Sequence, residues 1–339
     1  MPDSRKKRIV ARADKVLPGV WRLRLPISIW PGVPHVNAWA VSSGNGVVLF
    51  DTGLGEPGGF AQLELALRQA GLSVDHIRLV VCTHAHSDHY GLAAPIVERT
   101  GCELWMHPNH DHMLRNAGDP AGWLERRLEV ARQSGVPPES LEAYREARKD
   151  AETGVAGIVH PDRELVPGVE VETDLGVWQV HETPGHAPSH VVLHQPERRL
   201  LITGDHLLGR ISLYYDFGYT PDPGGEFLRS LDVVEGLDAD LCLPGHGRPF
   251  RGVPAKAQAY RELVLERVAK VRESLVAGPL TPYEVVPCLL GPDPSELARN
   301  WAMGEVLVYL RHLEVEGEIE EVGGEPTRFR LAQERGAAA

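Results

Sequence analysis

The sequence predicts an α/β fold with a large first domain and a small C-terminal one, and three observations lead to this prediction. Short apolar strands alternate with helical segments over roughly the first 250 residues. Histidine or aspartate residues follow directly after several of these strands. After Pro254 the pattern changes to helices followed by a hairpin. The length of 339 residues suits two domains, because it exceeds that of one average domain.

The N-terminal part is predicted to begin with strands. From Val20 to Asp51 short apolar or alternating runs are broken by turn residues, and Gly44-Asn45-Gly46 is a hairpin signal between two of these runs. The segment 60–70 has apolar residues at helical spacing, which predicts a helix. A largely apolar run at 77–83 then predicts a strand, and a helix is expected at 92–99.

The remainder of the chain divides into three parts. The helix-rich, charged stretch of about 109–156 is interpreted as a helical insertion, and strand signals return between 170 and 243. Helices are then expected at about 256–276, 282–289 and 301–316, with a hairpin at 318–331. We therefore expect a first domain over residues 1–253 and a winged-helix-like C-terminal domain over 254–339.

Composition and charge exclude several classes of protein. The apolar fraction of 42% is that of an ordinary soluble globular protein, and no segment has the apolar length of a membrane-spanning helix. The net charge of −12 argues against attraction of the whole chain to nucleic acid or to an anionic membrane. The basic N-terminus lacks the apolar core of a signal peptide, so we expect a cytoplasmic protein. The four cysteines of the chain are scattered singly and are expected to be reduced.

A dense cluster of metal-binding side chains follows the strand at 77–83. His84, His86, Asp88 and His89 lie within six residues, and imidazole nitrogens and carboxylate oxygens are ligands that Zn²⁺ and neighbouring divalent metals prefer. On a tight loop the alternating His84 and His86 can point to one side while Asp88 and His89 reach a second position. One loop can therefore serve two metals. The density of the cluster disfavours the alternative of a loop that is rich in histidine by chance.

Three further polar residues also follow strands, each of them after a glycine. They lie in the sequences Thr183-Pro-Gly-His186, Thr203-Gly-Asp205 and Leu243-Pro-Gly-His246. Each glycine allows the backbone to turn sharply and to approach a site closely. A single histidine after a turn is more often a structural hydrogen-bonding residue than a ligand. Together with the first cluster, however, these residues supply seven potential ligands.

Taken in order along the chain, these motifs resemble those of the metallo-β-lactamase superfamily. The resemblance spans roughly the first 250 residues and includes Asp51-Thr-Gly53. It implies an αβ/βα sandwich with the site at one edge of its two sheets, and a supporting role for Asp51. It also implies a ligand set of His84, His86 and His186 on the first metal, Asp88, His89 and His246 on the second, and Asp205 bridging the two.

A two-metal site of this kind predicts a binuclear metallohydrolase. Each metal can lower the pKa of a shared water to give hydroxide at neutral pH, while the metals polarise the substrate oxygen. Asp88 is a candidate for orienting this nucleophile. His190 either contacts the substrate or leaving group or is an ordinary hydrogen-bonding residue. Zinc is the expected metal, with manganese and iron as alternatives, because His/Asp ligands accept all three.

Differences between branches of the superfamily narrow the substrate. Asp205 stands where true β-lactamases of this fold usually have a cysteine, and His86 stands where the di-iron oxygen-reducing branch has a glutamate. The sequence instead resembles the thioesterase, lactonase and nuclease branches, the first of which includes glyoxalase II. Its C-terminal unit resembles that of the LACTB-two-like group. We expect a small ester, thioester or lactone as substrate. The alternatives are a phosphodiesterase or endoribonuclease and a mononuclear iron dioxygenase acting on a thiol derivative.

Several residues outside the ligand set have two interpretations. The C-terminal unit from Lys256 has a net charge of −4, which favours a packing or homodimerisation module over a binder of nucleic acid. The insertion, with Trp123 and Tyr144, is either a lid over the site or a set of packed helices. Tyr214 and Tyr215 are assigned either to the pocket lining or to the core. The three histidines of the 107–112 region are expected at the rim or on the surface.

Overall fold

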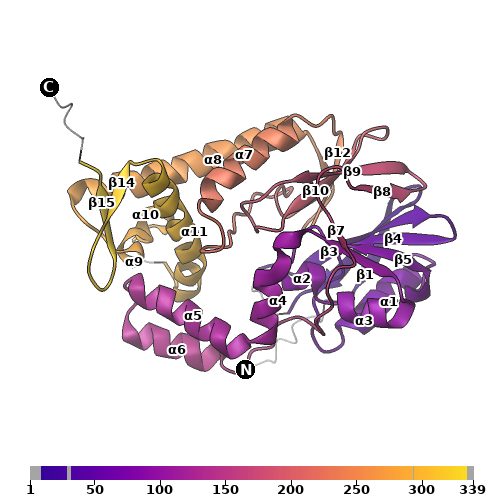
Figure 1. The fold of residues 1–339 in the computed structure, drawn as a ribbon, viewed down its shortest axis with the longest axis horizontal. Helices are drawn as coiled ribbons and strands as arrows, with labels where there is room; N and C mark the ends of the chain where they lie inside the picture. The colour runs from indigo at the N-terminus through magenta and orange to yellow at the C-terminus, as the bar shows by residue number, and fades with distance from the viewer. Residues whose placement is uncertain (1–8, 29–31, 293, 334–339) are drawn as a thin grey trace, which may run out of the picture.

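Two β-sheets face each other, with helices on both outer faces, in the αβ/βα sandwich that the sequence predicts (Figure 1). The computed structural model describes residues 9–28, 32–292 and 294–333, and the basic N-terminal residues 1–8 lie outside this part. The first sheet has seven strands in sequential order: β1 (Arg12–Leu17), β2 (Val20–Pro26), β3 (His35–Ser43), β4 (Gly46–Phe50), β5 (Ile77–Val81), β6 (Glu103–Met106) and β7 (Arg163–Glu164).

The second sheet has six strands in the order β13-β12-β11-β10-β9-β8. Its strands β11 and β12 run parallel, as do β4 and β5 of the first sheet, while β3 and β4 form the antiparallel hairpin predicted around Gly44-Asn45-Gly46. The strand bounds are β8 (Glu170–Thr173), β9 (Gly176–Glu182), β10 (Val191–Gln195), β11 (Leu200–Gly204), β12 (Leu241–Pro244) and β13 (Phe250–Arg251).

Large apolar side chains fill the space between the two sheets. Trp39, Phe50 and Val81 of the first sheet pack in one buried cluster with Trp178 and Leu193 of the second. The ring centroids of Phe50 and Trp178 lie 5.5 Å apart, in a tilted arrangement that aromatic pairs favour. Burial of this area contributes most of the favourable free energy that holds the sheets together.

Helices cover the outer face of each sheet. Helices α1 (Gly59–Gln69) and α3 (Ala93–Thr100), which match the two predicted helices, pack on the first sheet, and η1 (Val74–His76) precedes β5. The outer face of the second sheet packs against α7 (Pro223–Glu235) and α8 (Val253–Ser274). Helix α7 was not predicted from the sequence. The apolar cluster beneath α7 and α8 continues into α11 (Glu296–Val315), beyond the predicted boundary at residues 253/254.

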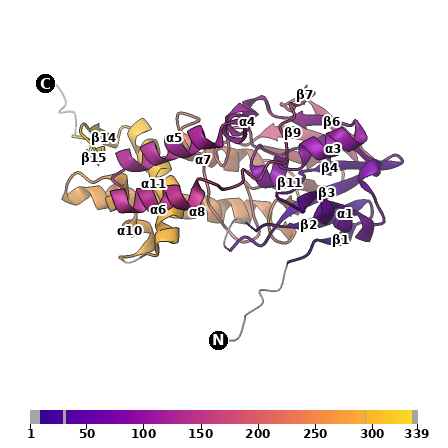
Figure 2. The ribbon, with the colours of Figure 1, turned by 90° about the horizontal axis from the view of Figure 1, so that it is seen from below.

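The predicted insertion consists of helices, and it contacts the C-terminal unit. It contains η2 (Pro108–His110), α4 (Asp111–Gly118), α5 (Pro120–Gln133) and α6 (Pro138–Arg148). Backbone N–H groups of Tyr283 and Thr327 donate to the carbonyls of Ser134 and Gln133, at 3.0 and 2.8 Å, where α5 ends. Figure 2 shows α5 and α6 alongside the C-terminal helices. The C-terminal unit also contains η3 (Leu275–Ala277), α9 (Pro282–Val285), α10 (Pro287–Leu290), β14 (Ile319–Val322) and β15 (Arg328–Leu331).

The helices and the hairpin expected after Pro254 are therefore present, while their assignment as a winged-helix-like domain stays a prediction. Within the described residues, none of the helices combines the length and the apolar character that crossing a bilayer requires.

Candidate metal centre

The potential ligands lie where strands of both sheets end. Asp51 follows β4 and the cluster 84–89 follows β5, which is parallel to β4. Asp205 and His246 follow β11 and β12, which are also parallel. Because parallel strands end at the same edge of a sheet, each sheet brings its polar residues to one place. A short helix, α2 (Ser87–Tyr90), follows β5 where a loop was expected, and it carries Asp88 and His89.

Three imidazoles form the first group. His84 Nε2 lies 3.0 Å from His86 Nδ1. His186 Nε2 lies 3.3 Å from His84 Nε2 and 3.0 Å from His86 Nδ1. Zinc–nitrogen bonds in a tetrahedral site place neighbouring ligand nitrogens about 3.4 Å apart. The three nitrogens thus have the spacing of atoms that share one metal ion, and all three residues are buried.

The second group joins two imidazoles and a carboxylate. Asp88 Oδ2 lies 3.2 Å from His246 Nε2 and 3.5 Å from His89 Nε2. Asp205 contacts both groups, because its Oδ2 lies 3.1 Å from His246 Nε2 and 3.8 Å from His186 Nε2. Its Oδ1 lies 3.5 Å from His89 Nε2. All seven residues predicted as ligands are therefore brought together at one site.

The second ring nitrogen of each imidazole is turned away from the site and meets a protein acceptor. His186 Nδ1 and His246 Nδ1 each donate to a backbone carbonyl at 2.9 Å, of Tyr214 and His35 respectively. His84 Nδ1 lies 3.0 Å from the hydroxyl of Thr83. These partners fix the ring orientation and leave the inward nitrogen with a free lone pair.

Asp51 anchors the loop that carries the first cluster. Its Oδ1 accepts the backbone N–H of Thr83 at 2.8 Å, and its Oδ2 accepts Nδ1–H of His89 at 2.9 Å. The backbone of Asp51 has a φ of 61°, a left-handed conformation that is uncommon for residues other than glycine. The surrounding hydrogen bonds hold it in that conformation, and strained residues of this kind cluster at functional sites.

The donor set suits divalent cations. Asp88 Oδ2, His89 Nε2 and Asp205 Oδ1 are buried and have no hydrogen-bond partner in the described part of the chain, which is costly unless a cation satisfies them. Burial lowers the pKa of His84 well below its usual value and that of His186 to about 4, so both imidazoles are neutral. Burial opposes ionisation of Asp205, but His246 and His89 outweigh it and hold its pKa well below the usual range. The imidazoles of His84 and His186 and the carboxylate of Asp205 are thus in the forms that bind metals.

His190 has protein partners on both ring nitrogens. Nδ1 lies 2.8 Å from the hydroxyl of Thr183, and Nε2 accepts the backbone N–H of Asp205 at 3.1 Å. Of the two interpretations of His190, these contacts favour the hydrogen-bonding one over contact with substrate. The residue supports the backbone that presents Asp205, and its side chain is 1% exposed.

Asp216 supports the site, and this role was not predicted from the sequence. Its Oδ2 accepts from His86 Nε2 at 2.9 Å and from His112 Nε2 at 3.1 Å, so it supports an imidazole of the first group. The only feature of the sequence that indicates this role is the position of Asp216, an acidic residue directly after the apolar segment that contains Tyr214 and Tyr215. The expectation that the histidines of the 107–112 region lie at the rim or on the surface is wrong, because all three are buried.

The two tyrosines before Asp216 take different places. Tyr215 is buried in the core, with its ring 5.4 Å from that of Phe227. The Tyr214 ring instead lies 5.5 Å from the His86 ring and 5.7 Å from the His186 ring. Tyr214 therefore lines the metal centre, and Tyr215 does not.

Comparison with known proteins gives consistent results. The family model described as the Metallo-beta-lactamase superfamily matches residues 31–246. A probable metallo-hydrolase of Bacillus subtilis (strain 168), YqjP, is 27% identical over 80% of this chain and 86% of its own. The crystal structure of a metallo-beta-lactamase family protein from Thermus thermophilus has a TM-score of 0.78 and 29% identity, over 94% of this chain and all of its own. An atrochrysone carboxyl ACP thioesterase of Aspergillus chevalieri is 28% identical over 44% of this chain and 51% of its own.

Proposed function

Because the chain belongs to the metallo-β-lactamase superfamily, we propose that it is a hydrolase that uses two divalent metal ions to act on a small ester, thioester or lactone. The observation that carries this proposal is the pair of ligand groups that the Asp205 carboxylate joins. His84, His86 and His186 would hold one ion, and Asp88, His89 and His246 the other. When bound, the two ions would lower the pKa of a shared water and polarise the substrate oxygen.

The protein's own side chains would fix the geometry of the reaction. Asp88 would orient the attacking water and accept its proton, since its carboxylate lies beside His246 at the buried second group. Asp51 and Asp216 would hold the imidazoles of His89 and His86 in place from outside. His190 would keep the backbone of Asp205 in position. This rigidity would keep the reacting groups in a productive arrangement.

Two observations support a carbonyl substrate over a phosphoryl one. One relative, the atrochrysone carboxyl ACP thioesterase of Aspergillus chevalieri, is a thioesterase, an enzyme that hydrolyses a thioester. The chain has a net charge of −12, which disfavours a polyanion such as RNA. We also propose that residues 1–253 form the catalytic domain and that residues 254–339, as a winged-helix-like unit, serve for packing.

Metal analysis tests the two-ion part of this proposal. Purified protein that has been dialysed against metal-free buffer and analysed by plasma mass spectrometry should contain about two ions per chain, mainly zinc. His246→Ala should reduce this content, because it removes a ligand of the second group. A single tightly held iron together with oxygen consumption would contradict the proposal and would instead indicate an iron dioxygenase.

A substrate panel tests the reaction. We expect hydrolysis of an ester, thioester or lactone, and Asp88→Ala should reduce the turnover of the true substrate by several orders of magnitude. Asp75→Ala is the matched control, because this carboxylate is exposed and pairs with Arg99 at the surface. Cleavage of bis-phosphodiesters or single-stranded RNA that depends on Asp88, without ester or thioester hydrolysis, would replace the proposal with a phosphodiesterase. Equal activity in the wild type and in Asp88→Ala would indicate a contaminating enzyme and would contradict the proposed function.

A further inference from the structure

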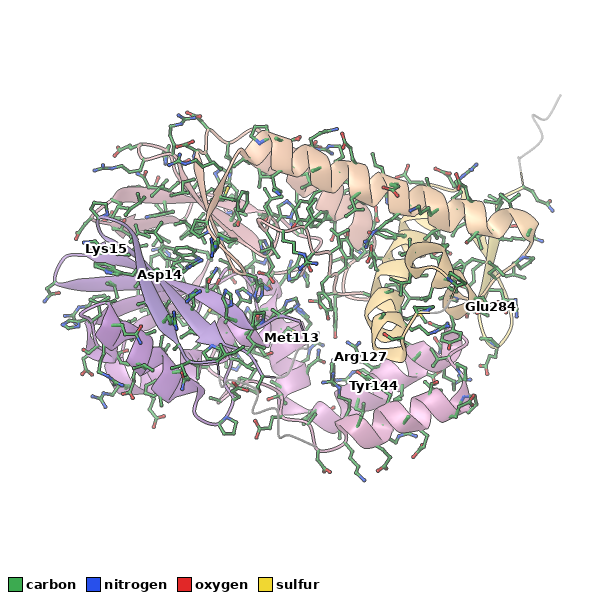
Figure 3. The ribbon with its side chains drawn as sticks, turned by 180° about the vertical axis from the view of Figure 1, so that it is seen from behind. Asp14, Lys15, Met113, Arg127, Tyr144 and Glu284 are labelled. Carbon is green, nitrogen blue, oxygen red and sulfur yellow. The ribbon has the colours of Figure 1, made fainter. Side chains whose placement is uncertain are left out.

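One arginine of the insertion lies close to the metal centre among aromatic side chains. Arg127 extends from α5, and its guanidinium carbon lies 5.1 Å from the ring centroid of Trp123, one helical turn earlier. The guanidinium donates hydrogen bonds to the hydroxyl oxygens of Tyr144 on α6 and of Tyr214. Figure 3 shows Arg127 and Tyr144 next to each other on these two helices. Three aromatic side chains thus hold the cation in place.

Tyr214 connects this arginine to the metal centre. Its hydroxyl contacts Arg127, while its ring lies 5.5 Å from the His86 ring. Its backbone carbonyl accepts Nδ1–H of His186. One tyrosine side chain therefore separates the guanidinium from two of the predicted ligands. A group bound at Arg127 would lie within the length of a small substrate from the two metals.

The contacts of Arg127 are with aromatic side chains. Within the described segments of the chain, no carboxylate forms an ion pair with Arg127, whereas its neighbour Arg126 pairs with Asp119 at 3.4 Å. Its two hydrogen-bonding partners, Tyr144 and Tyr214, are phenols and not carboxylates. Arg127 is exposed to solvent, so an anion can reach it. A cation in such surroundings favours an anion that can reach it.

We propose that Arg127 binds an anionic group of the substrate, a carboxylate or a phosphate, while the bond to be hydrolysed lies at the metal centre. This inference rests on the proposed hydrolase function and adds a substrate class to it. The guanidinium presents donors in a planar fork that matches the oxygens of either anion. Tyr144 and Tyr214 orient the fork, and Trp123 supports its face. Arg127 is thus a specificity-determining residue, separate from the metal ligands.

Matched pairs of substrates test this assignment. For the carboxylate, p-nitrophenyl glutarate is compared with the neutral p-nitrophenyl valerate, and for the phosphate, acetyl phosphopantetheine with acetyl pantetheine. Arg127→Gln should reduce kcat/KM for the preferred anionic member by about 10- to 100-fold, the loss expected when a charge-assisted hydrogen-bond partner is removed. The neutral member should be hydrolysed nearly as before. Arg126→Gln removes the same charge from the neighbouring position on α5 and should change neither rate.

Direct binding separates this inference from the hydrolase proposal. Calorimetric titration of the metal-loaded full chain with glutarate and with inorganic phosphate should show at least a tenfold weaker affinity in Arg127→Gln for one of the two anions, and no change in Arg126→Gln. Arg127-dependent binding without any hydrolysis would support the anion site and contradict the proposed function. Equal binding and an equal preference for anionic substrates in wild type and Arg127→Gln would overturn the anion site alone. If Arg127→Gln proves unstable, Arg127→Lys keeps the charge and should retain part of the preference.

Discussion

The outer partners of the site imidazoles differ in kind from one residue to the next. His186 and His246 donate to neutral backbone carbonyls, whereas His86 and His89 donate to the carboxylates of Asp216 and Asp51. A carboxylate partner makes the imidazole a stronger electron donor to a metal than a carbonyl does. Burial opposes the charge of Asp216, but His86 and His112 hold its pKa far below the usual range, so it remains ionised.

Removal of the charge of Asp216 should therefore weaken the first group. We expect Asp216→Asn to reduce the affinity for the ion at the first group by about 10- to 100-fold, which is typical for the loss of a partner of a ligand. Competition with a chromophoric chelator measures this affinity. Asp75→Asn, at an exposed ion pair, should leave it unchanged. An unaltered affinity in Asp216→Asn would show that His86 needs no carboxylate partner.

At this scale the sequence reveals ligands better than it reveals their supports. His84, His86, Asp88 and His89 are adjacent in the chain after an apolar strand, so their shared role is visible without a structure. Asp216 lies 130 residues from His86 and has no motif around it. The long-range path of the chain brings it to the site, and no local pattern encodes that path.

Among the elements, α7 shows how a helix can escape prediction and still form part of the core. Asp222 caps it by accepting the backbone N–H of Gly225, and Pro223 is its first residue, which is a strong helix start. Phe227, Leu231 and Val234 recur at helical spacing and are buried against the second sheet. These signals were present in the sequence. The two glycines after Pro223 argue against a helix, because glycine is unfavourable in helix interiors.

Truncation within this face should destabilise the fold. Leu231 lies on the buried face of α7 and is fully buried, so Leu231→Ala should lower the free energy of unfolding by about 2–5 kcal/mol through lost burial and a cavity. Chemical denaturation measures the change. Val233, on the same helix, is 38% exposed, and Val233→Ala should cost less than about 1 kcal/mol. Equal losses in the two variants would mean that α7 is not held by this apolar face.

For the whole molecule, the metal centre is also a link between the two sheets. Its predicted ligands come from loops after β5 in the first sheet and after β9, β11 and β12 in the second. An ion that binds there holds both sheets in their native arrangement. Binding of this kind favours the folded state over the unfolded state, in which the ligands are dispersed.

Metal removal should therefore lower the thermal stability. Each ion present at about 100 times its Kd adds about 2.7 kcal/mol to the free energy of unfolding, and chelation removes that contribution. Thermal melts with and without EDTA should differ clearly in Tm for the wild type. The difference should be smaller in His246→Ala, which lacks one ligand of the second group. Identical melts for wild type with and without EDTA would exclude a stabilising ion.

The layered arrangement could be predicted because the motifs, in their order along the chain, resemble those of the metallo-β-lactamase superfamily, which implies this architecture, and the family model matches residues 31–246. The contact between the insertion and the C-terminal unit could not be predicted from the sequence. It depends on backbone hydrogen bonds such as that from Thr327 to Gln133, which join segments far apart in the chain and leave no trace in side-chain pattern. The division into two domains likewise stays a prediction, since one apolar cluster spans the predicted boundary.

The hydrogen bonds at the end of α5 have a mechanical consequence. One interpretation of the insertion is a lid over the site. A lid that moves freely needs an end without contacts to the rest of the protein. Here the end of α5 is fastened to the C-terminal unit by backbone bonds from Tyr283 and Thr327 and by the pair of Arg132 and Glu325. Helix α5 therefore cannot swing away from the hairpin of β14 and β15 unless these contacts break.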